Sequence, residues 1–122
     1  MTVAEVPFER LEQLSVWIRA HRLAVNVYKT VQGLPEAQRF GPIDQMHRAA
    51  QLVPANIAEA IKREGQADKV RFYNIAQTYL EELRYHIIRY PDLEYKVGYE
   101  SLLEQVERVS RMLKGLINPI RV

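Results

Sequence analysis

Apolar residues recur every three or four positions along almost the whole chain, and this spacing is the feature that most limits its fold. It places apolar side chains on one face of an α-helix, whereas a half-buried strand alternates every second residue. Sustained alternation does not occur anywhere in the 122 residues. The spacing therefore predicts an all-α protein.

Short stretches that contain glycine or proline divide the periodic pattern into four segments. We expect helices over residues 8–32, 42–64, 67–90 and 95–117. Gly33 and Pro35 end the first segment, Pro91 ends the third, and Asn118 and Pro119 close the fourth. Because short connections make consecutive helices antiparallel neighbours, the sequence predicts an up-down-up-down four-helix bundle.

A chain of this length has room for one hydrophobic core, so residues 1–122 are expected to form one domain with the bundle over about 8–118. The core should form where the four apolar stripes meet. Its expected members are Trp17, Tyr28, Met46, Val53, Ile57, Tyr73, Leu80, Leu83, Leu102, Val106, Leu113 and Leu116.

The stretch LVPANIAEA, residues 52–60, puts a proline inside the second expected helix. Pro54 has no backbone N–H, so the Ala50 carbonyl loses its usual donor, at a cost of roughly 3 kcal/mol in a helix interior. We expect a kink at this point. Asn56 and Glu59 follow it, and we favour a polar cluster that holds the bend over the alternative that both side chains point to water.

Positive charge gathers at the C-terminal end although the net charge is only +2. Arg108, Arg111, Lys114 and Arg121 follow one another with no acid between them. Cations there stabilise a helix through its dipole, and they can also bind phosphate groups. Further candidate contacts for nucleic acid are Arg19, Arg22, Lys62, Arg63, Lys69 and Arg71.

The third segment has more apolar and aromatic residues than one core-facing stripe requires. This surplus is either a wide core stripe or a surface for self-association, since large exposed apolar flanks usually mark contacts. Homo-oligomers commonly cover such surfaces. The candidate interface consists of Phe72, Ile75, Tyr79, His86 and Tyr90.

Residue patterns for catalysis or metal binding are missing. His47 follows Asp44 by three positions and His86 follows Glu82 by four, but the Glu-x-x-His motif of di-iron bundles is absent. There is no cysteine, no serine nucleophile motif and no phosphate-binding glycine loop. We expect His21 to be partly buried and hydrogen-bonded. We predict a non-enzymatic protein without catalytic residues, metal or cofactor.

The chain has no apolar stretch long enough to span a membrane and no secretory signal pattern. The absence of cysteine fits a reducing compartment. We therefore expect a cytoplasmic protein without a membrane partner or an evident small-molecule substrate.

Four stretches of the sequence are similar to those of a known protein family. They are FERLEQLSVWIRAHRLAVNVYK, LPEAQRFGPIDQMHRAAQLVPANIAEAIKR, RFYNIAQTYLEEL and RMLKGLI, in this order over residues 8–118. Together they resemble the bacterial four-helix-bundle proteins of the 23S rRNA intervening-sequence family. Ala60 and His47 depart from it, because the family usually has a glycine and an arginine there.

The resemblance implies a ring-shaped homopentamer. A related bundle, the accessory protein of diversity-generating retroelements, implies a basic pentameric barrel that binds nucleic acid and a reverse transcriptase. The leading hypothesis is thus an RNA- or DNA-binding accessory protein that acts through basic surface patches. The alternative is a structural or protein–protein interaction module with no nucleic-acid role.

Overall fold

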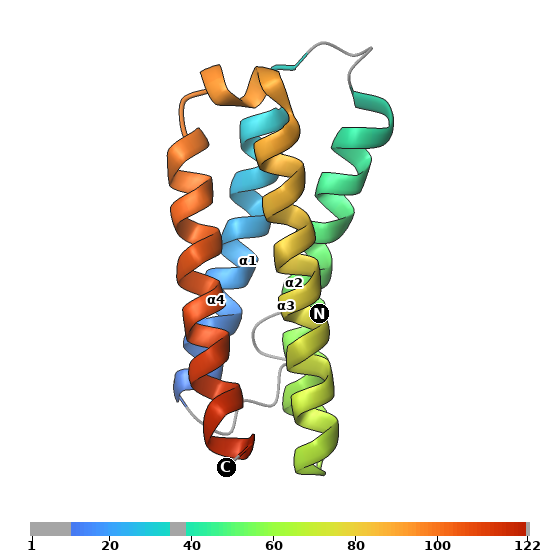
Figure 1. The fold of residues 1–122 in the computed structure, drawn as a ribbon, viewed down its shortest axis with the longest axis vertical. Helices are drawn as coiled ribbons and strands as arrows, with labels where there is room; N and C mark the ends of the chain where they lie inside the picture. Colours follow the sequence, from blue (N-terminus) through green and yellow to red (C-terminus); the bar gives the residue numbers. More distant parts are fainter. Residues whose placement is uncertain (1–10, 35–38, 122) are drawn as a thin grey trace.

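The protein consists of four long α-helices joined by short connections (Figure 1). The computed structural model describes residues 11–34 and 39–121. The helices are α1 (Leu11–Val31), α2 (Asp44–Lys62), α3 (Gln66–Arg89) and α4 (Tyr99–Arg121), with a π-helical turn η3 (Arg39–Ile43) and a 3₁₀ turn η4 (Pro91–Tyr95). No strand occurs among the described residues. The all-α prediction is confirmed.

The helices run alternately up and down, and each packs against its neighbour in the sequence. α4 returns beside α1 and closes the bundle, so the two ends of the chain contribute adjacent helices (Figure 1). This confirms the predicted antiparallel four-helix bundle. The fold has two consequences for surface sites: one groove forms between α1 and α2, and another between α1 and α4.

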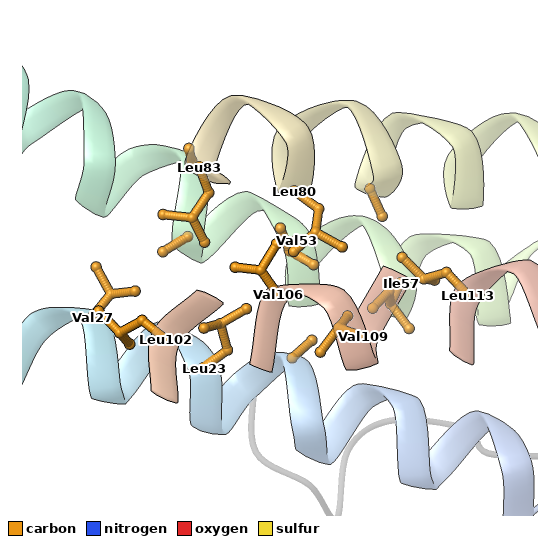
Figure 2. Close-up of a cluster of buried hydrophobic side chains, with 14 of the residues drawn as sticks. Leu23, Val27, Val53, Ile57, Leu80, Leu83, Leu102, Val106, Val109 and Leu113 are labelled. Atoms are coloured by element: carbon orange, nitrogen blue, oxygen red, sulfur yellow. The ribbon is translucent and has the colours of Figure 1, made fainter. Parts of the chain in front are cut away.

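Aliphatic side chains from all four helices meet along the bundle axis (Figure 2). Leu80 and Leu83 of α3 point toward Val53 of α2 and Val106 of α4, and none of these four is more than marginally accessible. Burying a side chain of this kind contributes about 1.5–3 kcal/mol relative to leaving it exposed. The interdigitated stripes therefore hold the helices together.

The prediction that Tyr28 belongs to the core is wrong. Tyr28 follows the apolar stripe of α1, yet it is 54% exposed. Its ring lies at the edge of the α1–α2 contact, tilted against the ring of His47 with the centroids 5.3 Å apart. The other predicted core residues are buried. Tyr28 belongs to the surface because its position on the stripe faces the boundary between the two helices.

The structure also moves two helix boundaries. α4 begins at Tyr99 rather than near Tyr95, because η4 and a turn at Gly98 come first. Gly98 has a φ of 98°, a conformation that residues with a Cβ rarely adopt. At the other end α4 continues through Pro119 to Arg121 instead of ending at residue 117. The expected start of the first helix at Phe8 lies outside the described residues.

Pro54 lies inside α2, and its ring is buried. The kink expected there stays a prediction. Asn56 Nδ2 donates to the Leu52 carbonyl at 2.8 Å, and Glu59 pairs with Arg63 at 3.0 Å. Asn56 and Glu59 thus have separate partners close by in the sequence, which differs from the joint cluster that we favoured from the sequence.

Candidate functional site

Three of the ten candidate cations form ion pairs at the junction of α2 and α3. The Glu59 carboxylate accepts a hydrogen bond from Arg63 at 3.0 Å and lies 3.8 Å from the ammonium group of Lys62. The guanidinium group of Arg71 lies 3.5 Å from the carboxylate of Asp68. These pairs are half-exposed and contribute at most about 1 kcal/mol each. They nevertheless place a carboxylate beside each cation, which lowers the positive potential that a phosphate group would meet.

Lys69 and the ring of Phe72 give the same junction a structural role. The Lys69 ammonium donates to the carbonyls of Ala60 and Ile61 at 3.3 and 3.0 Å, and so caps the C-terminal end of α2. The guanidinium groups of Arg63 and Arg71 lie over Phe72, 4.5 and 4.7 Å from the ring centroid. Cation–π contacts of this kind hold the arginines against the protein.

The basic tail is not a uniform zone in the structure. Arg111 lies 3.8 Å from Glu107, and Glu104 is exposed one turn before Arg108 on the same helix. Lys114 is exposed and has no ion pair within the described part of the chain. Arg121 ends α4, and its side chain lies outside the described residues. Two acids of α4 thus lie one turn before Arg108 and Arg111 and lower the positive potential at the start of the tail.

The α1–α4 boundary brings three other candidate cations together. Arg19 and Arg22 of α1 and Arg108 of α4 line a hollow of about 150 Å³, together with Asn26, Gln105 and Val109. None of the three arginines has an ion pair among residues 11–34 and 39–121. We call this feature the arginine hollow.

Two amide residues that the sequence did not single out, Asn26 and Gln105, also line the arginine hollow. Asn26 Nδ2 donates to Gln105 Oε1 at 2.9 Å across the α1–α4 boundary, and Gln105 Nε2 donates to Ser101 Oγ at 3.0 Å. The sequence could have indicated these two residues, because each is a polar residue beside the apolar stripe of its helix. The Asn26–Gln105 hydrogen bond connects α1 with α4 among the residues that line the hollow.

The expected self-association surface on α3 needs a correction. His86 and Tyr90 are only 7% and 8% exposed, because they face the interior of the bundle rather than its surface. Phe72 and Tyr79 are partly buried against the core, and Ile75 is partly exposed. The flank is thus largely a wide core stripe, and the structure removes His86 and Tyr90 from the candidate interface.

A larger apolar groove lies between α1 and α2. Its volume is about 650 Å³, and the two helices contribute five residues each. The ring of His21 stacks on Trp17 with parallel planes and centroids 5.2 Å apart, so His21 is exposed and stacked rather than partly buried and hydrogen-bonded as expected. The lining residues are Trp17, His21, Ala24, Val25, Tyr28, Gln51, Pro54, Ala55, Ala58 and Glu59. We call this feature the α1–α2 groove.

His47 lies beside Tyr28 near the end of this groove, and burial lowers its pKa below the ordinary value of 6.5 because burial disfavours the charged imidazolium. The carboxylate of Asp44 favours the charged form and offsets part of the shift. Well above pH 6.5 His47 is neutral both in the folded protein and in the unfolded chain. As the pH falls through 6.5, the unfolded chain binds the proton first and is stabilised.

We therefore expect the folded protein to lose stability as the pH falls below 6.5, and the loss to be smaller in His47→Gln. Thermal unfolding followed between pH 5 and pH 8 measures this difference. An NMR titration in which the His47 ring protonates above pH 6.5 would contradict the expectation.

The described residues contain no group of three or more side chains that could hold a metal ion. Glu82 and His86 approach within 3.5 Å, and the Asp44–His47 pair gains no third ligand. Within the same residues no helix is long and apolar enough to cross a membrane. The arrangement of side chains thus offers cation-lined and apolar surfaces as its candidate sites.

The fold and these surfaces define a four-helix bundle whose candidate sites are binding surfaces. The chain belongs to the family of 23S rRNA-intervening sequence proteins, whose family model matches residues 12–115. A similar solved structure is a protein of unknown function from the S23 ribosomal protein family of Bacteroides thetaiotaomicron VPI-5482. It is 24% identical, with a TM-score of 0.79 over 88% of this chain and 99% of that chain. This likeness shows the fold. No curated protein matches the chain.

Proposed function

We propose that this protein is a non-enzymatic, homo-oligomeric accessory protein of the cytoplasm that binds RNA or DNA through basic surface patches. The observation that carries the proposal is the arginine hollow. Arg19, Arg22 and Arg108 come from adjacent helices and have no carboxylate partner in the described part of the chain. Membership of a family defined by its link to ribosomal RNA supports the same function.

Binding of this kind is mainly electrostatic. Arginines that neutralise phosphate groups release condensed counterions, so the affinity falls steeply as salt is added. The described residues that line the hollow are three arginines, two amides and Val109, and none of them has an aromatic ring on which a base could stack. Contacts to phosphate position a nucleic acid but carry no sequence information by themselves. We therefore expect weak sequence selectivity.

Self-association is the second part of the proposal. The α1–α2 groove presents Val25 and Tyr28, and a different face of the molecule exposes Tyr85 and Ile88 of α3. Two different apolar surfaces on one chain favour head-to-tail contact, which closes into a ring when the rotation between copies allows it. The family resemblance makes a homopentamer the specific expectation. Such a ring would repeat the arginine hollow around its circumference.

A binding titration with structured RNA and with duplex DNA, at low and at moderate salt, tests the nucleic-acid part. The triple change Arg19→Gln, Arg22→Gln and Arg108→Gln is expected to weaken binding at low salt. It should also reduce the slope of log affinity against log salt, by about 0.7–0.9 for each phosphate contact that is lost. The change is expected to leave the fold intact, since it removes like charges from the surface.

The matched control is Lys62→Gln, Arg71→Gln and Arg111→Gln, which removes the same charge from cations that already have carboxylate neighbours. This control should reduce the affinity for nucleic acid less than the first triple change does. It should also leave most of the slope of log affinity against log salt unchanged. Equal losses in the two triple variants would mean that only net charge matters. A native protein that binds neither polymer at low salt would end the nucleic-acid proposal.

The α1–α2 groove favours a second candidate function, a structural or protein–protein interaction module. Its apolar lining suits a protein surface better than a phosphate backbone. The same titration with RNA and DNA distinguishes the two candidate functions. An interaction module would keep its assembly while binding neither RNA nor DNA.

A further inference from the structure

We infer that the arginine hollow is a discrete site for one phosphate group. This inference rests on the proposed function and deepens it, because it assigns one bound phosphate to a particular place on the protein. The hollow has a volume of about 150 Å³, several times the roughly 30 Å³ that a water molecule occupies in the liquid. It therefore has room for a tetrahedral oxyanion.

The chemistry of the lining fits such an anion. Each guanidinium is planar and can donate two parallel N–H bonds to phosphate oxygens, and it remains charged throughout the physiological range of pH. Arg19 and Arg22 lie three residues apart and therefore on the same side of α1. Arg108 meets them from α4. Donors that converge from two helices can contact different oxygens of the same phosphate.

The comparison with other arginines of this protein shows why the hollow differs from an ordinary solvated surface. Arg71 and Arg111 each lie beside a carboxylate on their own helix, and Arg63, which follows the last residue of α2, pairs with Glu59 of that helix. Among the residues that the structure describes, no acid lines the hollow. Three like charges around one hollow repel one another, and an anion between them relieves that repulsion.

The hydrogen bond between the two helices and the partial burial of Arg19 keep the site preorganised. The hydrogen bond of 2.9 Å between Asn26 and Gln105 connects α1 with α4 directly among the residues that line the hollow. Arg19 is partly buried, which restricts the conformations that its side chain can take. Both features lower the entropy that the protein loses when an anion binds. The hollow would thus hold one phosphate in a defined place, while Lys114 attracts the backbone less specifically.

Inorganic phosphate is the probe for this site. We expect NMR signals of the Arg19, Arg22 and Arg108 side chains to shift saturably as phosphate replaces chloride at constant ionic strength and pH. Arg108→Lys keeps the charge but loses bidentate geometry, so it should weaken phosphate binding roughly tenfold. Arg111→Lys, three residues further along α4, is the matched control and should leave phosphate binding unchanged. Thermal unfolding checks that both variants are folded.

Each outcome decides between the two claims. Saturable shifts together with competition between phosphate and RNA or DNA support the hollow as the place where a backbone phosphate binds. Shifts that stay linear, or that appear equally on Arg111 and Lys114, overturn the discrete site even if the native protein binds nucleic acid. Saturable phosphate binding in a protein that binds neither polymer supports the site for free phosphate and overturns the proposed function.

Discussion

Leu80→Ala is expected to lower the free energy of unfolding by about 2–5 kcal/mol, the range observed when a large buried aliphatic side chain is replaced by alanine. Leu80 is 0% exposed and lies where α3 meets α2 and α4 (Figure 2). The loss combines the transfer free energy of the removed methyl groups with the cavity that they leave. Urea unfolding measures it, and the slope against urea should stay unchanged if only the native packing weakens.

The control for this change is Val97→Ala, because Val97 is 99% exposed and its truncation should alter stability by no more than about 0.5 kcal/mol. Both variants must be compared at the same protein concentration, since self-association adds to apparent stability. A loss below about 1 kcal/mol in Leu80→Ala would show that the four stripes do not meet at this residue.

Val25→Glu combined with Tyr28→Glu is expected to abolish self-association while the monomer stays folded. Both side chains are exposed on the α1–α2 groove, so the new carboxylates face water in the isolated chain. In an assembly that covers the groove they would be desolvated without a partner, which costs several kcal/mol. Sedimentation velocity at micromolar concentration is expected to show the native protein as an oligomer and the double variant as a monomer.

Gln45→Glu combined with Thr78→Glu adds the same charge at exposed positions outside the groove and should preserve the oligomer. If the Val25 and Tyr28 variant keeps its native size, the groove is not the contact surface. If the native protein itself sediments as a monomer, the self-association proposal and the expected ring fail together.

The positions of the helices were predictable because amphipathic periodicity is a local property. The third helix was expected over residues 67–90 and spans Gln66–Arg89. Its core residues Leu80 and Leu83 were identified by their spacing alone, and both are fully buried. The start of α4 was less predictable, since the tyrosine at position 95 continues an apolar pattern that only the backbone turn at Gly98 interrupts.

Positions at the edge of a stripe depend on the neighbouring helix. Tyr28 and His86 both lie at helical spacing next to core residues, yet Tyr28 is exposed and His86 is buried. The sequence predicted the opposite for each. Spacing tells which side of a helix is apolar, but the distance to the next helix decides how far around that side the burial extends.

The sequence by itself determined the helices, their antiparallel order, the main core stripes, the family and the list of candidate cations. Only the tertiary structure decided which of those cations act together. Arg108 and Arg111 are close in sequence, but Arg108 joins Arg19 and Arg22 at the α1–α4 boundary while Arg111 lies beside Glu107. The physical reason is that helix formation depends on neighbours within a few residues, whereas a site between helices exists only after bundle closure brings distant segments into contact.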